Sequence, residues 1–403
     1  MVLSPEMAEL ALEFSPLGPP PPDPTNAVYE KPAAARLGQA LFFDTRLSGP
    51  GTVSCATCHD PGKGWGDGRR LAKAVAHHPR HTQTLWNVAY NRWFFWDGRK
   101  DTLWSQALAP IEDPREQAGS RLAVAHLVAS DPGYARAYAD VFGMRLAPLD
   151  PVRFPPAGRP VPGQPEHAHS IAWGSMTAVD QERVERIFVN VGKAIAAFER
   201  QIVSRRAPFD VFVEGLREDD RAKLRALSPS AQRGFALFAG KARCHLCHDG
   251  PEFSDLEFHF NRLPTGEGAD PGRQLGVRRL KRDPFNALSR YSDDGGAVGR
   301  VKVATLRRDG HPTLEFKTPS LRNVERTAPY MHEGQLATLA EVVEFYSSLE
   351  GAVPLVPGME RILQPAHLTA AEQVDLVAFL RSLTDEELAP ELQRAPATAY
   401  LPD

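Results

Sequence analysis

The 403-residue chain has few cysteines, no excess of either charge and no long apolar run, and each absence excludes a class of protein. The four cysteines are confined to two short strings, which leaves none for a framework of disulfides. The 47 Lys and Arg residues are balanced by 50 Asp and Glu residues, which argues against binding to nucleic acid. No apolar run reaches the ~18–20 residues that cross a bilayer, so we expect no membrane span.

The two cysteine strings share one pattern, and the residue that follows each determines its chemistry. Residues 55–59 read Cys-Ala-Thr-Cys-His, and residues 244–248 read Cys-His-Leu-Cys-His. Cys-x-x-Cys alone also suits a redox dithiol or a zinc site, but a histidine after the second cysteine is the signal for covalent attachment of haem c. The strings therefore predict two haems, each anchored by thioethers and ligated by its histidine. The residues expected to hold them are Cys55, Cys58, His59, Cys244, Cys247 and His248.

The cofactor also predicts a compartment. Haem c is attached outside the cytoplasm in bacteria, yet residues 1–6 show neither the basic nor the apolar region of a secretory signal. We expect a periplasmic protein whose signal peptide is absent from this sequence, with a cytosolic protein as the alternative that the N-terminus leaves open.

Prolines predict how the chain is divided. Eight prolines in the first 32 residues predict an extended arm rather than a helix, and seven in residues 148–165 predict a linker or a surface crossing. We expect a mainly α fold in which two cytochrome c-like haem domains pack together, with long loops and little strand. The predicted units are an arm (1–32), an N-terminal haem domain (33–147), a linker (148–176), a C-terminal haem domain (177–390) and a tail (391–403).

Helix signals are more frequent than strand signals. Apolar residues spaced by three and four predict a long helix over about 177–205, and Thr-x-x-Glu capping boxes open two more, at Thr338 and Thr369. The best strand signal is residues 300–306. Residues 258–317 are rich in Gly, Pro, Asp and Arg and predict a long ordered excursion over a haem domain.

Three longer motifs accompany the cysteine strings. Residues 95–103 read Phe-Trp-Asp-Gly-Arg-Lys-Asp-Thr-Leu, residues 317–324 read Lys-Thr-Pro-Ser-Leu-Arg-Asn-Val, and residues 327–334 read Thr-Ala-Pro-Tyr-Met-His-Glu-Gly. With these motifs, from about residue 35 to 383, the chain resembles the bacterial di-haem cytochrome c peroxidase and MauG family. The resemblance implies that the His59 haem reacts with H2O2 and that the His248 haem stores and relays electrons.

Four further residues match functional positions of that family. Trp96 matches the tryptophan placed between the two haems, where an indole can carry an electron; plain interdomain packing is the alternative. Gln106, Pro110 and Glu116 match residues over the open face of the first haem. The resemblance implies that Glu116 moves the proton of H2O2, although a solvated loop carboxylate is the alternative.

The loop after the first haem departs from many peroxidases of the family. They carry a distal histidine there, but residues 71–75 contain none, and His77 and His78 come two or more positions late. This predicts a first haem that is open without reductive activation, unless a gap in the match brings His77 into play.

A second departure concerns the far side of the second haem. Fourteen positions after His332 the family's cytochrome c peroxidases have methionine, whereas this chain has Tyr346. Tyrosinate is a hard anionic donor that stabilises higher oxidation states of iron, as in the MauG pattern, in which both haems share oxidising equivalents as a bis-ferryl state. The alternatives are that Tyr346 is a core residue and that Met331 or Met359 ligates the iron.

The resemblance also implies a calcium site between the domains. Thr327 and Pro329 match its ligands, but His81 stands where the family has an asparagine, and histidine is a poor ligand for calcium. The expected cofactors are therefore two haems, with a Ca2+ ion left open.

Three functions follow as expectations. The leading one is a di-haem peroxidase that reduces H2O2, shares oxidising equivalents between its haems and oxidises a partner protein at Trp or Tyr. The second is a conventional cytochrome c peroxidase with a small cytochrome or cupredoxin as donor. The third is a non-catalytic di-haem electron carrier or sensor.

Overall fold

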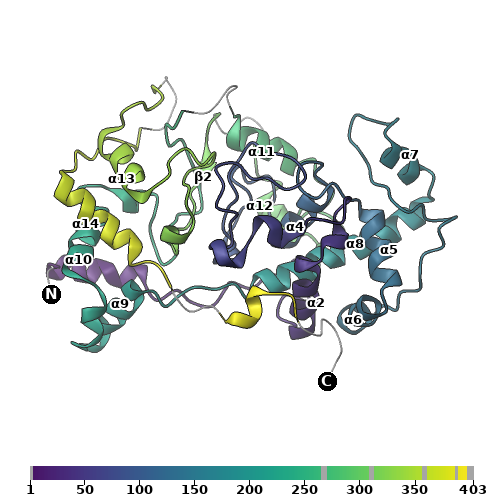
Figure 1. The fold of residues 1–403 in the computed structure, drawn as a ribbon, viewed down its shortest axis with the longest axis horizontal. Coiled ribbons are helices and arrows are strands. Elements are labelled where there is room, and N and C mark those ends of the chain that lie inside the picture. The colour runs from purple at the N-terminus through teal and green to yellow at the C-terminus, as the bar shows by residue number, and fades with distance from the viewer. Residues whose placement is uncertain (1–2, 265–269, 308–312, 356–360, 386–388, 397–403) are drawn as a thin grey trace.

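The regular secondary structure of the computed structural model is mainly helical, with long loops, which confirms the mainly α prediction (Figure 1). Within the described part of the chain, one short sheet pairs β1 (Phe258–His259) with β2 (Phe316–Lys317) in antiparallel register. The structure describes residues 3–264, 270–307, 313–355, 361–385 and 389–396. The α-helices are α1 (Pro5–Ala11), α2 (Pro32–Phe43), α3 (Cys55–Cys58), α4 (Leu103–Glu112), α5 (Arg121–Ser130), α6 (Pro132–Phe142), α7 (Ala168–Gly174), α8 (Ala178–Glu199), α9 (Pro208–Glu218), α10 (Pro229–Ala239), α11 (Gly272–Leu280), α12 (Ala297–Lys302), α13 (Leu339–Ser348) and α14 (Ala370–Arg381). The 3-10 turns are η1 (Leu12–Phe14), η2 (Thr45–Leu47), η3 (Pro61–Lys63), η4 (Val88–Tyr90), η5 (Lys223–Ala226), η6 (Cys244–Leu246), η7 (Val324–Arg326) and η8 (Pro390–Gln393).

Two large hydrophobic cores divide the molecule into two units, and one cysteine string packs against each core. In the first unit, α8 packs against α2, α4 and α5; in the second, α10 packs against α14, which also contacts α13 (Figure 1). The predicted caps are present, because the side chains of Thr177, Thr338 and Thr369 accept from the backbone N–H three residues on. The helix that opens at Thr177 ends at Glu199 rather than near residue 205.

A glycine allows the closest helix crossing in each unit. A Cβ atom at Gly38 of α2 would lie 1.9 Å from the carbonyl oxygen of Ala194 on α8. A Cβ atom at Gly234 of α10 would lie 2.0 Å from the carbonyl oxygen of Asp375 on α14. Both separations are far below van der Waals contact, so each helix pair can approach this closely only with glycine at that position.

We predict that Gly38→Ala lowers the free energy of unfolding by about 3 kcal/mol, the upper end of the usual cost of overpacking a core. The added methyl group meets backbone of α8, which cannot move aside as a flexible side chain could. Urea unfolding of the haem-loaded protein measures the effect. Gly174→Ala on α7 is the control, since nothing lies within 4 Å of the place that its Cβ atom would take; equal losses in both variants would contradict the explanation.

The boundary between the units differs from the prediction of a linker at residues 148–176. Phe154 and Trp173, within that segment, are buried in the first core, and the N–H of Gly158 donates to the hydroxyl of Ser120. Helix α8, assigned by the sequence to the second domain, also belongs to the first core. The chain passes between the cores at residues 203–208, so the proline-rich segment is a surface crossing of the first unit.

The arm is not wholly extended, and it joins the two units. Helix α1 forms because Pro5 suits the first turn and the Ser4 hydroxyl accepts from the Met7 N–H, so the prediction of no helix there was wrong. Phe14 packs in the second core, and the purple N-terminal segment lies beside α10 in Figure 1. Further along, the side chain of Asn26 donates to the carbonyl of Lys193 in the first unit.

The C-terminal segment also joins the two units, since it leaves the second unit and then contacts the first. After α14 of the second unit, the amide of Gln39 on α2 donates to the carbonyls of Glu391 and Arg394, and Leu392 packs against the first core. The predicted tail therefore begins as an ordered contact, and residues 397–403 lie outside the described residues.

The predicted strand at residues 300–306 was also wrong. Helix α12 occupies Ala297–Lys302, because the Asp294 carboxylate accepts from the N–H groups of Gly296 and Val298 and satisfies the start of the helix. The excursion that contains this helix packs on the first unit, because Phe285 and Tyr291 are buried in the first core. Among the described residues, no helix has the length and apolar character needed to cross a membrane.

Candidate active site

One continuous cavity lies between the two units and is lined by both cysteine strings. Cys58 and His59 contribute from the first string, and Cys244, Cys247 and His248 contribute from the second. The positions expected to anchor two cofactors therefore open into one shared space.

The first string folds into the single turn of α3. The backbone N–H of Ser54 donates to the hydroxyl of Thr57, and the N–H of His59 donates to the carbonyl of Cys55. Trp65 has a φ of 60°, which turns its carbonyl back so that it accepts from Nδ1 of His59 over 3.0 Å. This hydrogen bond orients the ring and leaves Nε2 as the nitrogen free to bind a metal.

The second string uses the same arrangement. The N–H of His248 donates to the carbonyl of Cys244, and Nδ1 of His248 donates to the carbonyl of Phe253 over 2.9 Å. Phe253 has a φ of 51°, matching the left-handed conformation of the acceptor in the first unit. Burial lowers the pKa of both histidines, which keeps them in the neutral form that ligates iron.

The cysteines fit haem attachment better than the alternatives of a dithiol or a zinc site. Burial raises the pKa of Cys55, Cys58 and Cys244 to about 12, whereas reactive dithiols need a lowered pKa. Among the described residues, no group of His, Cys, Asp and Glu side chains close enough to share a metal contains two cysteines. Paired thiols followed by a histidine with Nε2 free are the donor set that haem c requires.

Of the three residues expected over the first haem, two line the cavity. Gln106 and Glu116 do so, and Oε1 of Gln106 is buried without a hydrogen-bond partner among the described residues. Pro110 is not among the lining residues; it lies one turn further along α4 and has no N–H to donate to the carbonyl of Gln106.

Glu116 has the electrostatics of a proton-transfer group. Burial raises its pKa to about 7, Asp113 acts in the same direction, and Arg99 and Arg115 oppose the shift. A carboxyl group with a pKa near neutrality can both accept and return a proton under ordinary conditions.

His78 was not predicted as a site residue, although it lines the cavity. Its Nε2 lies 3.9 Å from Oε1 of Glu116, whereas His77, which the sequence left as an alternative, is exposed and does not line the cavity. The N–H of His78 donates to the carbonyl of Ala72, so the loop turns back into the cavity. No sequence signal marks this turn, which is why the histidine was missed.

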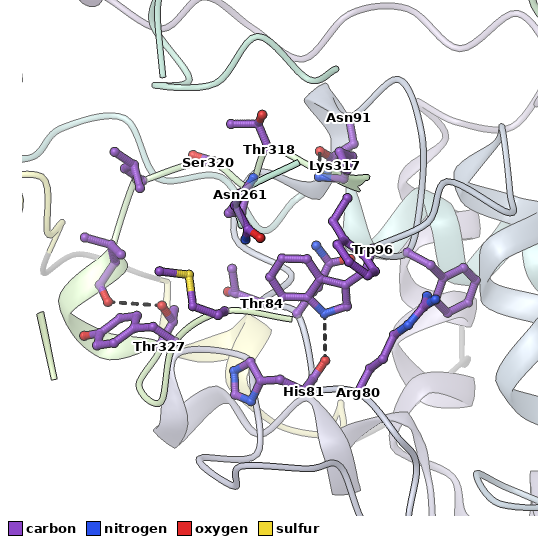
Figure 2. Close-up of a pocket in the computed structure, with 18 of the residues that line it drawn as sticks. Arg80, His81, Thr84, Asn91, Trp96, Asn261, Lys317, Thr318, Ser320 and Thr327 are labelled. Atoms are coloured by element: carbon purple, nitrogen blue, oxygen red, sulfur yellow. Dashed lines mark hydrogen bonds between the residues drawn. The ribbon is translucent and has the colours of Figure 1, made fainter. Parts of the chain in front are cut away.

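Trp96 lies where the two units meet. Figure 2 shows its indole N–H directed at the carbonyl of His81, to which it donates over 2.9 Å. From the second unit, the N–H of Lys317 donates to the carbonyl of Trp96, and the ring of His332 lies 6.4 Å from the indole ring. The indole lines the cavity that holds both strings, as a conduit between two haems would require.

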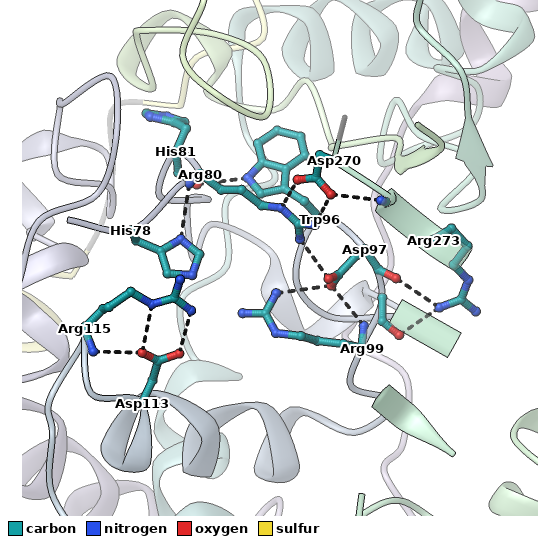
Figure 3. Close-up of polar contacts among 12 residues, drawn as sticks. His78, Arg80, His81, Trp96, Asp97, Arg99, Asp113, Arg115, Asp270 and Arg273 are labelled. Atoms are coloured by element: carbon teal, nitrogen blue, oxygen red, sulfur yellow. Dashed lines mark hydrogen bonds and ion pairs between the residues drawn. The ribbon is translucent and has the colours of Figure 1, made fainter. Parts of the chain in front are cut away.

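A buried ion-pair cluster fixes the backbone next to Trp96 (Figure 3). Asp97, whose side chain is 0% exposed, pairs with Arg80 at 2.9 Å and with Arg99 at 3.2 Å. Burial opposes ionisation, but Arg99 and Arg80 prevail and lower the pKa of Asp97 to about 2. Arg80 also binds Asp270, so the cluster joins the excursion to the first unit next to the indole.

Tyr346 lines the cavity beside the second string. It lies on α13, is half-buried, and its hydroxyl has no hydrogen-bond partner among the described residues. Burial raises its pKa, with the Cys244 and Cys247 thiols acting in the same direction. Met331 lines the same cavity, so it remains the competing ligand, and Met359 lies outside the described residues.

Thr327 and Pro329, which are expected to bind calcium, also line the cavity. The hydroxyl of Thr327 donates to the carbonyl of Val324, and Nδ1 of His81 donates to the carbonyl of Arg69. The donating hydroxyl of Thr327 keeps its lone pairs, so this residue remains able to bind a cation through oxygen.

The chain is similar in sequence to known peroxidases along almost its whole length. Residues 32–218 match the family described as di-haem cytochrome c peroxidase. The chain is 35% identical over 387 residues to cytochrome-c peroxidase IdrP1 of Denitromonas iodatirespirans, covering 93% of this chain and 88% of the relative. It is 34% identical over 367 residues to the methylamine utilization protein MauG of Methylorubrum extorquens, covering 91% and 82%. The chain belongs to the di-haem cytochrome c peroxidase and MauG family.

The fold agrees with that assignment. A crystal structure of a MauG-like protein associated with microbial copper homeostasis matches with a TM-score of 0.62 and 27% identity, covering 94% of this chain and 97% of that one. The diheme peroxidase BthA of Burkholderia thailandensis matches with a TM-score of 0.62 and 25% identity, covering 91% and 89%. The protein is therefore a di-haem oxidoreductase, and its family implies two c-type haems, H2O2 and a redox partner.

Proposed function

We propose that this peroxidase reduces H2O2 at the haem held by His59 and shares the oxidising equivalents with a second haem held by His248 and Tyr346. The observation that carries the proposal is the unpartnered phenol of Tyr346 beside Cys244 and Cys247. The phenol faces the cavity and has no hydrogen-bond partner among the described residues, and coordination to iron would give it one. Tyrosinate at this iron favours its higher oxidation states over an electron-storage role.

The residues of the first cavity have separate tasks in this proposal. The haem irons, when bound, supply the redox chemistry. Glu116 accepts a proton from H2O2 and returns it to the departing oxygen, and the amide of Gln106 orients the peroxide. Trp96 carries the electron between the units. Its indole N–H donates to a backbone carbonyl, which cannot take a proton, so the indole keeps its proton when it is oxidised.

We further propose that the reducing equivalents come from a partner protein oxidised at Trp or Tyr, in the periplasm. The similarity to the relative named methylamine utilization protein MauG supports a protein as the electron donor. A conventional cytochrome c peroxidase with a small cytochrome or cupredoxin as donor is the second candidate. The similarity to the relative named cytochrome-c peroxidase IdrP1 favours this second candidate. Met331 also favours it, because Met331 lines the cavity and methionine is the sixth ligand expected for such a peroxidase.

We predict that Trp96→Phe leaves the first reaction with H2O2 intact and abolishes the oxidation of the second haem. Mixing the diferric protein with H2O2 and recording Mössbauer and near-infrared spectra measures how the two oxidising equivalents are distributed. Trp173→Phe is the control, because Trp173 is buried in the first core and does not line the cavity. If the native protein keeps both oxidising equivalents in the first unit, the proposed sharing between the haems is wrong. The conventional cytochrome c peroxidase would then be the better description.

We also propose that Thr327 and Pro329 hold a calcium ion, because both line the cavity and both offer oxygen atoms. Metal analysis of the purified protein, before and after a chelator, decides whether one is bound.

A further inference from the structure

The loop that follows the first string is paired with the segment that carries Glu116. The N–H of Val75 donates to the carbonyl of Glu116, and the N–H of Ala76 donates to that of Arg115. This pairing directs His78 into the cavity, where its side chain is 15% exposed and that of Glu116 is 23% exposed. Figure 3 shows His78 between the backbone of Arg80 and the Asp113–Arg115 pair.

The hydrogen bonds of His78 determine which nitrogen carries its proton. The N–H of Arg80 donates to Nδ1 over 3.3 Å, so Nδ1 is the acceptor and the hydrogen lies on Nε2. Burial, Arg99 and Arg115 lower the pKa of His78 to about 4, which keeps the ring neutral at neutral pH. The nitrogen that faces Glu116 at 3.9 Å is therefore an N–H donor.

The charges around the pair favour a hydrogen bond over a bound cation. His78, Asp113 and Glu116 offer ligand atoms within 4.8 Å of one another, which by distance alone could hold a metal. The guanidinium of Arg115 already pairs with Asp113 at 3.3 Å, and Arg99 adds a second positive charge to the same cavity. A cation would have to displace these groups, whereas a neutral donor need not.

We propose that His78 is a positioning residue that donates its Nε2 hydrogen to the ionised carboxylate of Glu116 and holds it ready to accept the proton of H2O2. The proposal rests on the peroxidase function above and adds a residue to it. A 3.9 Å separation closes to hydrogen-bond length through a small rotation of either side chain when the site is occupied. It also explains a histidine in this cavity without making it an iron ligand.

The test is the pH profile of the reaction between the haem-loaded protein and H2O2, followed by stopped-flow absorbance. In the native protein the acid limb is expected near a pKa of about 7. The His78→Leu variant loses a hydrogen bond to the charged carboxylate, which raises the pKa of the acid limb by about one unit. The rate of this variant is therefore expected to be about fivefold lower at pH ~7 and unchanged at pH ~9. His78→Gln, which keeps an N–H donor, is expected to restore the native profile.

His77→Leu is the matched control, because His77 is the adjacent, exposed histidine. A reactive native protein whose profile is the same in His78→Leu overturns the inference alone. A low-spin EPR signal in the resting native protein that His78→Leu removes also overturns it, because His78 would then ligate iron. A native protein inert to H2O2 overturns the proposed function and this inference with it.

Discussion

A Glu116→Gln variant is expected to react with H2O2 about 10²–10⁴ times more slowly than the native protein, the usual contribution of general acid–base catalysis. Glutamine keeps the size of the side chain and its place in the cavity but cannot accept a proton. Stopped-flow mixing of the diferric protein with H2O2 measures the rate directly. Glu9→Gln, at an exposed position of α1, is the control for removing one negative charge.

The rate of the reaction with H2O2 is also expected to depend on pH, through the ionisation of Glu116. Burial raises the pKa of Glu116 to about 7, so its carboxyl group is protonated below that pH and ionised above it. Because the ionised form accepts the proton, the native rate should rise between about pH 6 and about pH 8, and the glutamine variant should show no such rise. A native rate that is flat over this range would contradict the role given to Glu116.

Replacing Tyr346 by methionine is expected to raise the reduction potential of the second haem by several hundred millivolts, within the ~0.8 V range that axial ligands cover. A thioether favours the ferrous state, whereas tyrosinate favours the higher oxidation states. The variant should then store electrons at the second haem and reduce H2O2 with a small cytochrome as donor. Spectroelectrochemical titration and steady-state oxidation of that donor measure the two changes.

Met331→Leu separates this prediction from its alternative. Both side chains line the cavity beside the second string, so either could reach the iron. If Met331→Leu shifts the reduction potential of the second haem and Tyr346→Phe does not, Tyr346 is a core residue. The proposal that Tyr346 ligates the iron is then wrong. The opposite pattern supports Tyr346 as the ligand.

Residues close in sequence could be predicted well, because their chemistry is local. Cys55–Cys58 fold into one helical turn, and His59 follows on the same turn, so the string itself determines the arrangement. Thr369 likewise caps α14 through a contact with Glu372 three residues on. Glu116, expected over the first haem, lies at the cavity, and α4 fills about half of the interval between it and Trp96.

Residues joined across long stretches of chain could not be predicted in this way. Arg80 meets Asp270 although 190 positions separate them, and neither residue type signals its partner. His78 enters the cavity only because its loop pairs with the Glu116 segment. The same limit explains the misplaced domain boundary, since the proline content of residues 148–165 cannot show which core the segment covers.

The crossing termini make this a molecule that cannot be cut into its halves. A fragment ending near residue 202 would carry α1 and Phe14 away from the second core, and one beginning near residue 208 would lose the first core, against which Leu392 packs. Each half would therefore expose apolar surface that the other half now covers. The two units should accordingly melt in a single transition, and the separation between their redox centres should be as constant as the interior of one domain.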